Sequence, residues 1–264
     1  LPFVGVNGQI IPRHIFENFS GSNAQEAPAN RIAVGTGPYR VVEFREEDIL
    51  IIGDDVVSTI KIIYEPNPYF REANKPFFKR VVLQGGGDAR VAAEAVLRDG
   101  IIDYGYNLQV AIHVLEALED SGQGILFTPP TAWTERIMIN FSDPNRETGS
   151  GERSSVQFPH PFLGNRMIRQ AINLSVDRAK ITKLYGKTGN LATNLLHSPA
   201  RYKSPNTNWE YNLEKAAALL DESGWKDSDG DGVRNKDGLR LSLVFQTSIN
   251  SVRQETQKII KAAL

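Results

Sequence analysis

The pattern most informative about the fold lies between Asn165 and Trp225 and begins NRMIRQAINLSVDRAKITKLYG (165–186). It continues with LLHSPARYKSPNTNWEYN (195–212) and ends with LEKAAALLDESGW (213–225). In its first part, apolar residues recur at spacings of three and four, which predicts one buried face of an amphipathic helix. These residues are Met167, Ile168, Ala171, Ile172 and Leu174. The stretch therefore predicts a layer of helices packed against another layer.

Capping residues divide this stretch into separate helices. Asp177 can cap a second helix, because its short carboxylate can accept from the free amides of a first turn. Gly186 and Gly189 can end that helix, and Gly224 can end a third one, since glycine adopts the left-handed backbone of a helix C-terminus. The apolar residues of the second and third helices are Ile181, Leu184, Tyr185, Ala216, Leu219 and Leu220.

The order of short motifs in this stretch resembles the family 5 extracellular solute-binding proteins, which are the peptide- and nickel-binding receptors of ABC importers. The pattern is R-x-x-R-Q-A-I-x-x-x-V-D-R-x-x-I, a Ser-Pro loop, and then Y-x-x-E-K-A-x-x-L-L-x-E-x-G-W. The matching residues include Arg166, Arg169, Val176, Asp177, Arg178, Ser198, Pro199, Tyr211, Glu214, Lys215, Gly224 and Trp225. A second block, GTGPY at 35–39, is similar to a motif of the same family.

The resemblance implies an α/β fold of the type II periplasmic binding protein kind, with two lobes that are both incomplete. We expect residues 1–130 to be part of lobe I and residues 131–264 to be a C-terminally truncated lobe II. The boundary is placed at Pro129–Pro130 because a double proline cannot lie inside a central strand. Apolar runs predict strands at 39–44, 48–52, 59–64, 80–83, 101–104, 124–127, 132–141 and 239–245. The polar segment 142–161 is long for a connection and is expected to be a mobile insertion.

The function implied by the resemblance is the capture of a small solute, an oligopeptide above all, for an ABC permease by hinge closure of two lobes. Within that class the solute could instead be a metal chelate or an oligosaccharide. A ligand-sensing regulatory module could also reuse the same fold, because fold does not determine function. The family's location implies a periplasmic or extracellular protein, with a lipoprotein anchor as a further expectation and any signal outside this sequence.

Three loops carry aromatic and amide side chains that suit a ligand-binding cleft, at 104–109, 131–136 and 246–251. In the family, positions like these face the cleft between the lobes. The ligand-binding residues implied by the resemblance are Tyr106, Asn107, Trp133, Arg136, Gln246 and Ser248. The alternative for each aromatic side chain is packing in the core.

A metal site is indicated by KDSDGDGVRNKDG at 226–238. Asp227, Asp229 and Asp231 alternate along a glycine-rich turn, so their carboxylates can converge on one hard cation, and a structural calcium ion is the expectation. Gly238 stands where a calcium loop has its bidentate glutamate. The alternative is a hairpin turn whose acidic side chains are solvated.

Composition and motifs argue against several other classes of function. The 264 residues have a formal charge of −1, which provides no electrostatic reason to expect nucleic acid as a partner. The chain has no cysteine, and no apolar run approaches the roughly 20 residues of a membrane-spanning helix. Its four histidines are scattered, and no nucleophile elbow, HExxH motif or phosphate loop is present. We therefore expect no catalytic residues and no organic cofactor.

Overall fold

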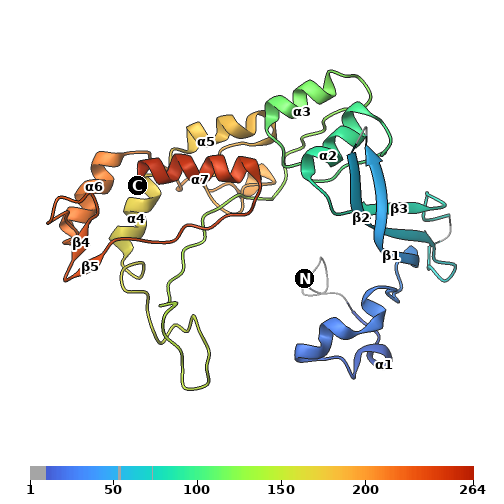
Figure 1. Cartoon of the computed structure of the whole chain (residues 1–264), viewed down its shortest axis with the longest axis horizontal. Helices are drawn as coiled ribbons and strands as arrows, with labels where there is room; N and C mark the ends of the chain where they lie inside the picture. Colours follow the sequence, from blue (N-terminus) through green and yellow to red (C-terminus); the bar gives the residue numbers. More distant parts are fainter. Residues whose placement is uncertain (1–9, 53–54, 73) are drawn as a thin grey trace. The chain divides into compact units, whose positions relative to one another are not determined.

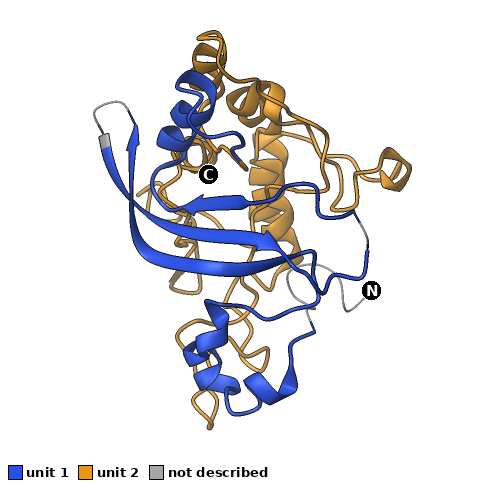
Figure 2. Ribbon diagram, turned by 90° about the vertical axis from the view of Figure 1, so that its right-hand side faces the viewer, with its two compact units in different colours: residues 1–105 blue, residues 106–264 orange. Residues whose placement is uncertain are grey.

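The computed structural model describes residues 10–52, 55–72 and 74–264, and its chain divides into two compact units (Figures 1 and 2). Unit 1 comprises residues 1–105 and unit 2 comprises residues 106–264. The predicted lobe boundary near residue 130 concerns the lobes of an intact receptor and stays a prediction.

Unit 1 is built on an antiparallel sheet in the order β1-β2-β3, formed by Tyr39–Ile52, Asp55–Pro66 and Val81–Gly85. The predicted strands at 39–44 and 48–52 are one continuous strand, bent by register shifts between Val41 and Glu43 and between Arg45 and Asp48. One face of the sheet buries Ile52, Thr59 and Ile63, as alternation along a strand requires. Short helical segments precede the sheet: α1 (Arg13–Phe16), η1 (Gly21–Glu26) and η2 (Pro28–Asn30).

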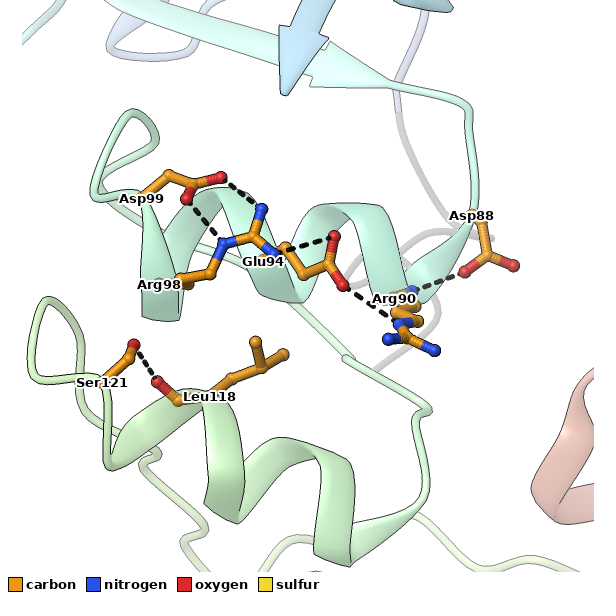
Figure 3. Close-up of polar contacts among 7 residues, drawn as sticks. All are labelled: Asp88, Arg90, Glu94, Arg98, Asp99, Leu118 and Ser121. Carbon is orange, nitrogen blue, oxygen red and sulfur yellow. Dashed lines mark hydrogen bonds and ion pairs between the residues drawn. The ribbon is translucent and has the colours of Figure 1, made fainter. Parts of the chain in front are cut away.

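The sheet is followed by α2 (Ala89–Ala93), which continues as a π-helical turn, η3 (Glu94–Arg98). Asp88 caps this helix, since its carboxylate accepts from the Arg90 amide at 2.6 Å. Glu94 is nearly buried and has an arginine on the turn before and after it. Its carboxylate contacts Arg90 Nε at 3.0 Å and an Arg98 guanidinium nitrogen at 3.6 Å (Figure 3). Arg98 also contacts Asp99, so four charged groups form one chain along the helix.

Unit 2 begins with α3 (Ile112–Glu119), which ends with the Ser121 hydroxyl donating to the Leu118 carbonyl (Figure 3). Its other helices are α4 (Arg166–Leu174), α5 (Arg178–Tyr185), α6 (Leu213–Glu222) and α7 (Ser251–Ala263). The turns η4 (Gly186–Thr188) and η5 (Ala200–Tyr202) lie between α5 and α6, and a small hairpin of β4 (Asn235–Lys236) and β5 (Leu239–Arg240) lies between α6 and α7.

The predicted helical layer is confirmed. Asn165 caps α4 and Asp177 caps α5, and the buried face of α4 carries Ile168, Ala171 and Leu174. Ala171 and Leu174 pack with Ala216 of α6, and Ile168 packs with Phe162, Leu163 and Trp225. Gly186 and Gly224 have the expected positive φ of 49° and 85°. Gly189 does not, because its φ of −134° is extended backbone.

Several predicted strands do not pair in the structure. Residues 101–104, 124–127 and 132–141, and most of 239–245, pair with no neighbouring strand in the part of the chain that the structure describes. Ile139 and Leu241 nevertheless pack against the core of unit 2. Alternating apolar residues predict an extended backbone, whereas a ladder requires a second strand at about 4.8 Å. The prediction of paired strands at these places was therefore wrong.

The segment 142–161 is a folded excursion. Bridges join Ser142 to Pro159 and Glu147 to Arg153, and the Arg146 guanidinium lies 3.9 Å from the centre of the Phe158 ring. Local hydrogen bonds and this cation–π contact give the segment a defined local structure, and the expectation of a mobile insertion stays a prediction.

Candidate functional site

The first turn of α7 joins two of the three predicted ligand loops. Asn250 caps the helix by accepting from the Arg253 amide at 3.0 Å. The Asn250 side-chain nitrogen also donates to the Gln109 carbonyl at 2.8 Å, across 141 residues of sequence. One amide side chain therefore caps α7 and fixes the backbone of the loop that carries Tyr106 and Asn107.

The second predicted loop reaches the same turn through an ion pair. Arg253 Nε lies 3.1 Å from a carboxylate oxygen of Glu135, and both side chains remain partly exposed. The Tyr185 hydroxyl, at the end of α5, is buried and makes no hydrogen bond within the described structure. Burial, reinforced by the negative charge of Glu135, raises the pKa of Tyr185, so the phenol stays protonated at neutral pH.

A fourth segment, which sequence reasoning did not include in the site, joins the second loop. Thr134 Oγ1 lies 3.3 Å from Nδ1 of His197, in the Ser-Pro loop. Thr134 and Glu135 are neighbours in an extended segment, so one contacts the Ser-Pro loop while the other contacts α7. Residues 133–136 thus lie between these two parts of unit 2.

The six predicted ligand-binding residues lie on these converging loops and point largely to solvent. Tyr106 is 69% exposed and Trp133 is 80% exposed, so neither is packed in a core of the described chain. Asn107 has a left-handed φ of 56°, which a small amide side chain tolerates. Arg136, Gln246 and Ser248 are exposed, and Ser248 Oγ accepts from the Asn250 amide at 3.3 Å. Their contact with a ligand stays a prediction.

Sequence reasoning did not name Glu135, Asn250 or Arg253, although the first two lie in predicted loops. It considered His197 as a residue that could line a cleft and favoured a surface or packing role for it. The N-cap role of Asn250 had a signal, since asparagine directly before an amphipathic run favours a helix start. The contacts of Glu135, His197 and Arg253 span 118 and 63 residues and left no local pattern.

Residues 226–238, which we call the acidic hairpin, contain a separate cluster of carboxylates. Asp227, Asp229 and Asp231 each have a carboxylate oxygen within 4.8 Å of the others, which suits a calcium ion with ligands at about 2.4 Å. The Asp227 carboxylate accepts from the amides of Gly230 and Gly232 at 2.8 and 3.0 Å. Arg240 pairs with Asp231 and holds the pKa of its carboxyl below the usual range. The three carboxylate oxygens are close enough to bind one cation. The guanidinium of Arg240 already offsets part of their negative charge.

The family model described as bacterial extracellular solute-binding proteins, family 5 Middle, matches residues 3–264. The chain belongs to this family. Among curated proteins, it is 24% identical over 268 residues to the oligopeptide-binding protein AppA of Bacillus subtilis, covering 97% of this chain and 42% of AppA. It is 32% identical over 208 residues to the oligopeptide-binding protein OppA of Lactococcus lactis subsp. cremoris, covering 77% of this chain and 33% of OppA.

Solved structures show the same fold. AppA of Bacillus subtilis in complex with a nonapeptide aligns with a TM-score of 0.64 and 22% identity, over 97% of this chain and 45% of that one. NikZ of Campylobacter jejuni in complex with Ni(L-His) aligns with a TM-score of 0.70 and 22% identity, over the same shares. The predicted type II periplasmic binding protein fold is confirmed, as an incomplete one, since the chain spans less than half the length of these relatives.

Family membership also bears on the class of protein. The family consists of extracytoplasmic solute-binding receptors and not of enzymes, which supports the non-catalytic prediction. In the described part of the chain, no helix has the length and apolar character needed to span a bilayer.

Proposed function

We propose that the natural polypeptide carrying these residues is a receptor that captures oligopeptides and delivers them to an ABC permease. Closure of two lobes would trap the peptide, because contacts to both lobes favour the closed state by their differential affinity. The receptor would work outside the cytoplasm, with a lipid anchor as part of the proposal. Its permease partner is proposed from the family alone.

The observation that carries the proposal is the convergence at α7 of loops that leave Tyr106 and Trp133 exposed. Exposed aromatic rings on hydrogen-bonded loops can stack on a ligand without first reorganising. Backbone groups and amides beside them can bind a peptide main chain regardless of its side chains, which suits loose sequence preference. The relatives AppA and OppA are oligopeptide-binding proteins by name, which supports the same class of solute.

Native mass spectrometry of the natural polypeptide, purified without denaturation, tests the proposal. We expect a ladder of bound peptide masses, whereas the 264-residue chain alone should carry less or none, because it spans under half of its relatives. A single mass matching a metal chelate or a sugar would overturn the peptide assignment and keep the receptor class. A protein that carries nothing and does not shift in melting temperature with peptide mixtures would contradict the transport role.

A further inference from the structure

The Ser-Pro loop, defined here as residues 191–204, is organised around one side chain. The Asn194 amide nitrogen donates to the carbonyls of Leu196 and Tyr202 at 2.6 and 3.4 Å, and its oxygen accepts from the Ser204 amide at 3.2 Å. Trp209 Nε1 donates to the Ala192 carbonyl at 3.0 Å and holds the start of the loop. The loop therefore has a defined conformation, and the short helical turn η5 is part of it.

This ordered loop exposes apolar side chains. Leu195 is 59% exposed and Leu196 is 66% exposed, directly before His197. Holding two leucines in water on a hydrogen-bonded scaffold costs hydrophobic free energy, and such exposed apolar groups commonly mark binding surfaces. The Thr134–His197 contact places this loop beside the segment that carries Trp133, which is 80% exposed.

Within the described residues, the His197 ring makes its hydrogen bonds through Nδ1. Its Nδ1 lies 3.2 Å from the Leu195 carbonyl and 3.3 Å from Thr134 Oγ1. A carbonyl oxygen can only accept, so Nδ1 carries the proton. In the neutral ring Nε2 then has a free lone pair, and neither of these two contacts uses it.

We propose that the Ser-Pro loop is a fourth ligand-facing loop, in which Leu195 and Leu196, with Trp133, contact an apolar side chain of the peptide while His197 Nε2 accepts a main-chain N–H. This inference rests on the proposed function. The ligand of this loop is inferred to be the same peptide, because the loop lies beside the predicted ligand loop 131–136. Its apolar side chains and the neighbouring acceptor His197 Nε2 are complementary to a peptide N–H next to an aliphatic side chain. Residues 106–109 of the predicted loop 104–109, together with loops 131–136 and 246–251, then bind the rest of the main chain.

The same nitrogen could in principle ligate a metal, because an Nδ1–H donated to a carbonyl is the usual arrangement of a metal-bound histidine. Among the described residues, however, the group of three or more metal-ligating side chains is the aspartate cluster of the hairpin, and His197 is not in it. A lone imidazole favours the acceptor role.

The test uses the natural polypeptide and synthetic peptides Ala-Ala-X-Ala-Ala with X as leucine or aspartate. Affinities are measured by calorimetry. We expect the leucine peptide to bind about tenfold more tightly, a ratio equivalent to about 1.4 kcal/mol. In Leu196→Ser this ratio should fall below about threefold. Val156→Ser is the matched control, because Val156 is also exposed, at 89%, and lies in the folded excursion.

A second measurement addresses His197. Each amide of the leucine peptide is methylated in turn, and one position should lose about tenfold in affinity with the wild type but under about threefold with His197→Phe. His113→Phe, on the exposed side of α3, is its control and should leave the wild-type pattern. Circular dichroism confirms that each variant is folded. If no peptide binds the wild type, the proposed function fails. If peptides bind with equal affinity for both X residues and no methylated position couples to His197, this inference is overturned and the receptor function stands.

Discussion

At the residue scale, His160 is fixed at the start of the α4 region by backbone amides. The amides of Phe162 and Leu163 donate to its Nδ1 at 3.3 and 3.1 Å, and the Phe162 ring packs edge-on at 4.5 Å. Desolvation lowers the pKa of His160, against a smaller opposite effect of Asp143. Protonation of Nδ1 would break both hydrogen bonds from the backbone amides, so folding favours the neutral form of the His160 ring.

The pH dependence follows from that sign. The folded pKa of His160 lies below the ordinary value of 6.5, so the unfolded state binds more protons as pH falls through that range. We expect the stabilisation to be complete above pH 6.5 and to be lost as pH falls below it. Urea melts at pH 7.5 and 5.5 should show a smaller pH effect in His160→Gln than in wild type. If His160→Gln shows the same change in stability with pH as the wild type, other groups cause that change. His113→Gln, at an exposed histidine, is the control.

Ile168 is the residue on which the core of unit 2 depends most directly. It is 1% exposed and packs with Phe162, Leu163 and Trp225. Ile168→Ala should lower the free energy of unfolding by about 2–5 kcal/mol, because it removes buried methyl groups and leaves a cavity. Ile249→Ala, at a side chain 95% exposed, should change it by less than about 0.5 kcal/mol. Chemical denaturation distinguishes the two, and equal effects would contradict the described core.

At the scale of elements, substitutions of Asn250 can distinguish its two roles, which are capping a helix and positioning a loop. Its oxygen caps α7, and its nitrogen holds Gln109. Asn250→Asp keeps the cap and loses the donor, whereas Asn250→Ala loses both. We expect Asn250→Ala to lower the free energy of unfolding by about 1 kcal/mol, and Asn250→Asp to lower it by much less. Both should bind peptide more weakly. Asn212→Ala, which removes the cap of α6, is the control that should lose stability and keep affinity.

The acidic hairpin is the other element that invites a test. Structural calcium at Asp227, Asp229 and Asp231 stays a prediction, and Arg240 competes for the same carboxylates. We expect millimolar calcium to raise the melting temperature, and Arg240→Gln to increase that shift by removing the competing charge. Asp229→Asn should abolish it. If calcium changes the melting temperature of neither the wild type nor Arg240→Gln, the calcium site is ruled out and the acidic side chains are merely solvated.

At the scale of the whole molecule, unit 2 contains its own core. The clusters around Ile168 and around Ala171 draw all their residues from 106–264. This unit is coloured orange in Figure 2. We therefore expect residues 106–264 expressed alone to keep the near-ultraviolet signal of buried Trp225. Its melting temperature should lie within about 4 °C of the corresponding transition of the whole chain, equivalent to about 1 kcal/mol. Loss of that signal would show that unit 2 depends on unit 1.

The local structure and the family could both be predicted from the order of the amino acids alone. The faces of α4 and α6, the caps at Asp88 and Asp177 and the left-handed glycines 186 and 224 follow from interactions within a few residues, which a linear pattern records. The loops that carry Tyr106 and Trp133 were also predictable, through the resemblance. The pairing of the strands could not be predicted in this way. Nor could the contacts by which Gln109, Glu135 and His197 join the start of α7 or the loop beside it. Such contacts depend on how distant segments pack, and a single hydrogen bond across 141 residues leaves no periodicity in the chain.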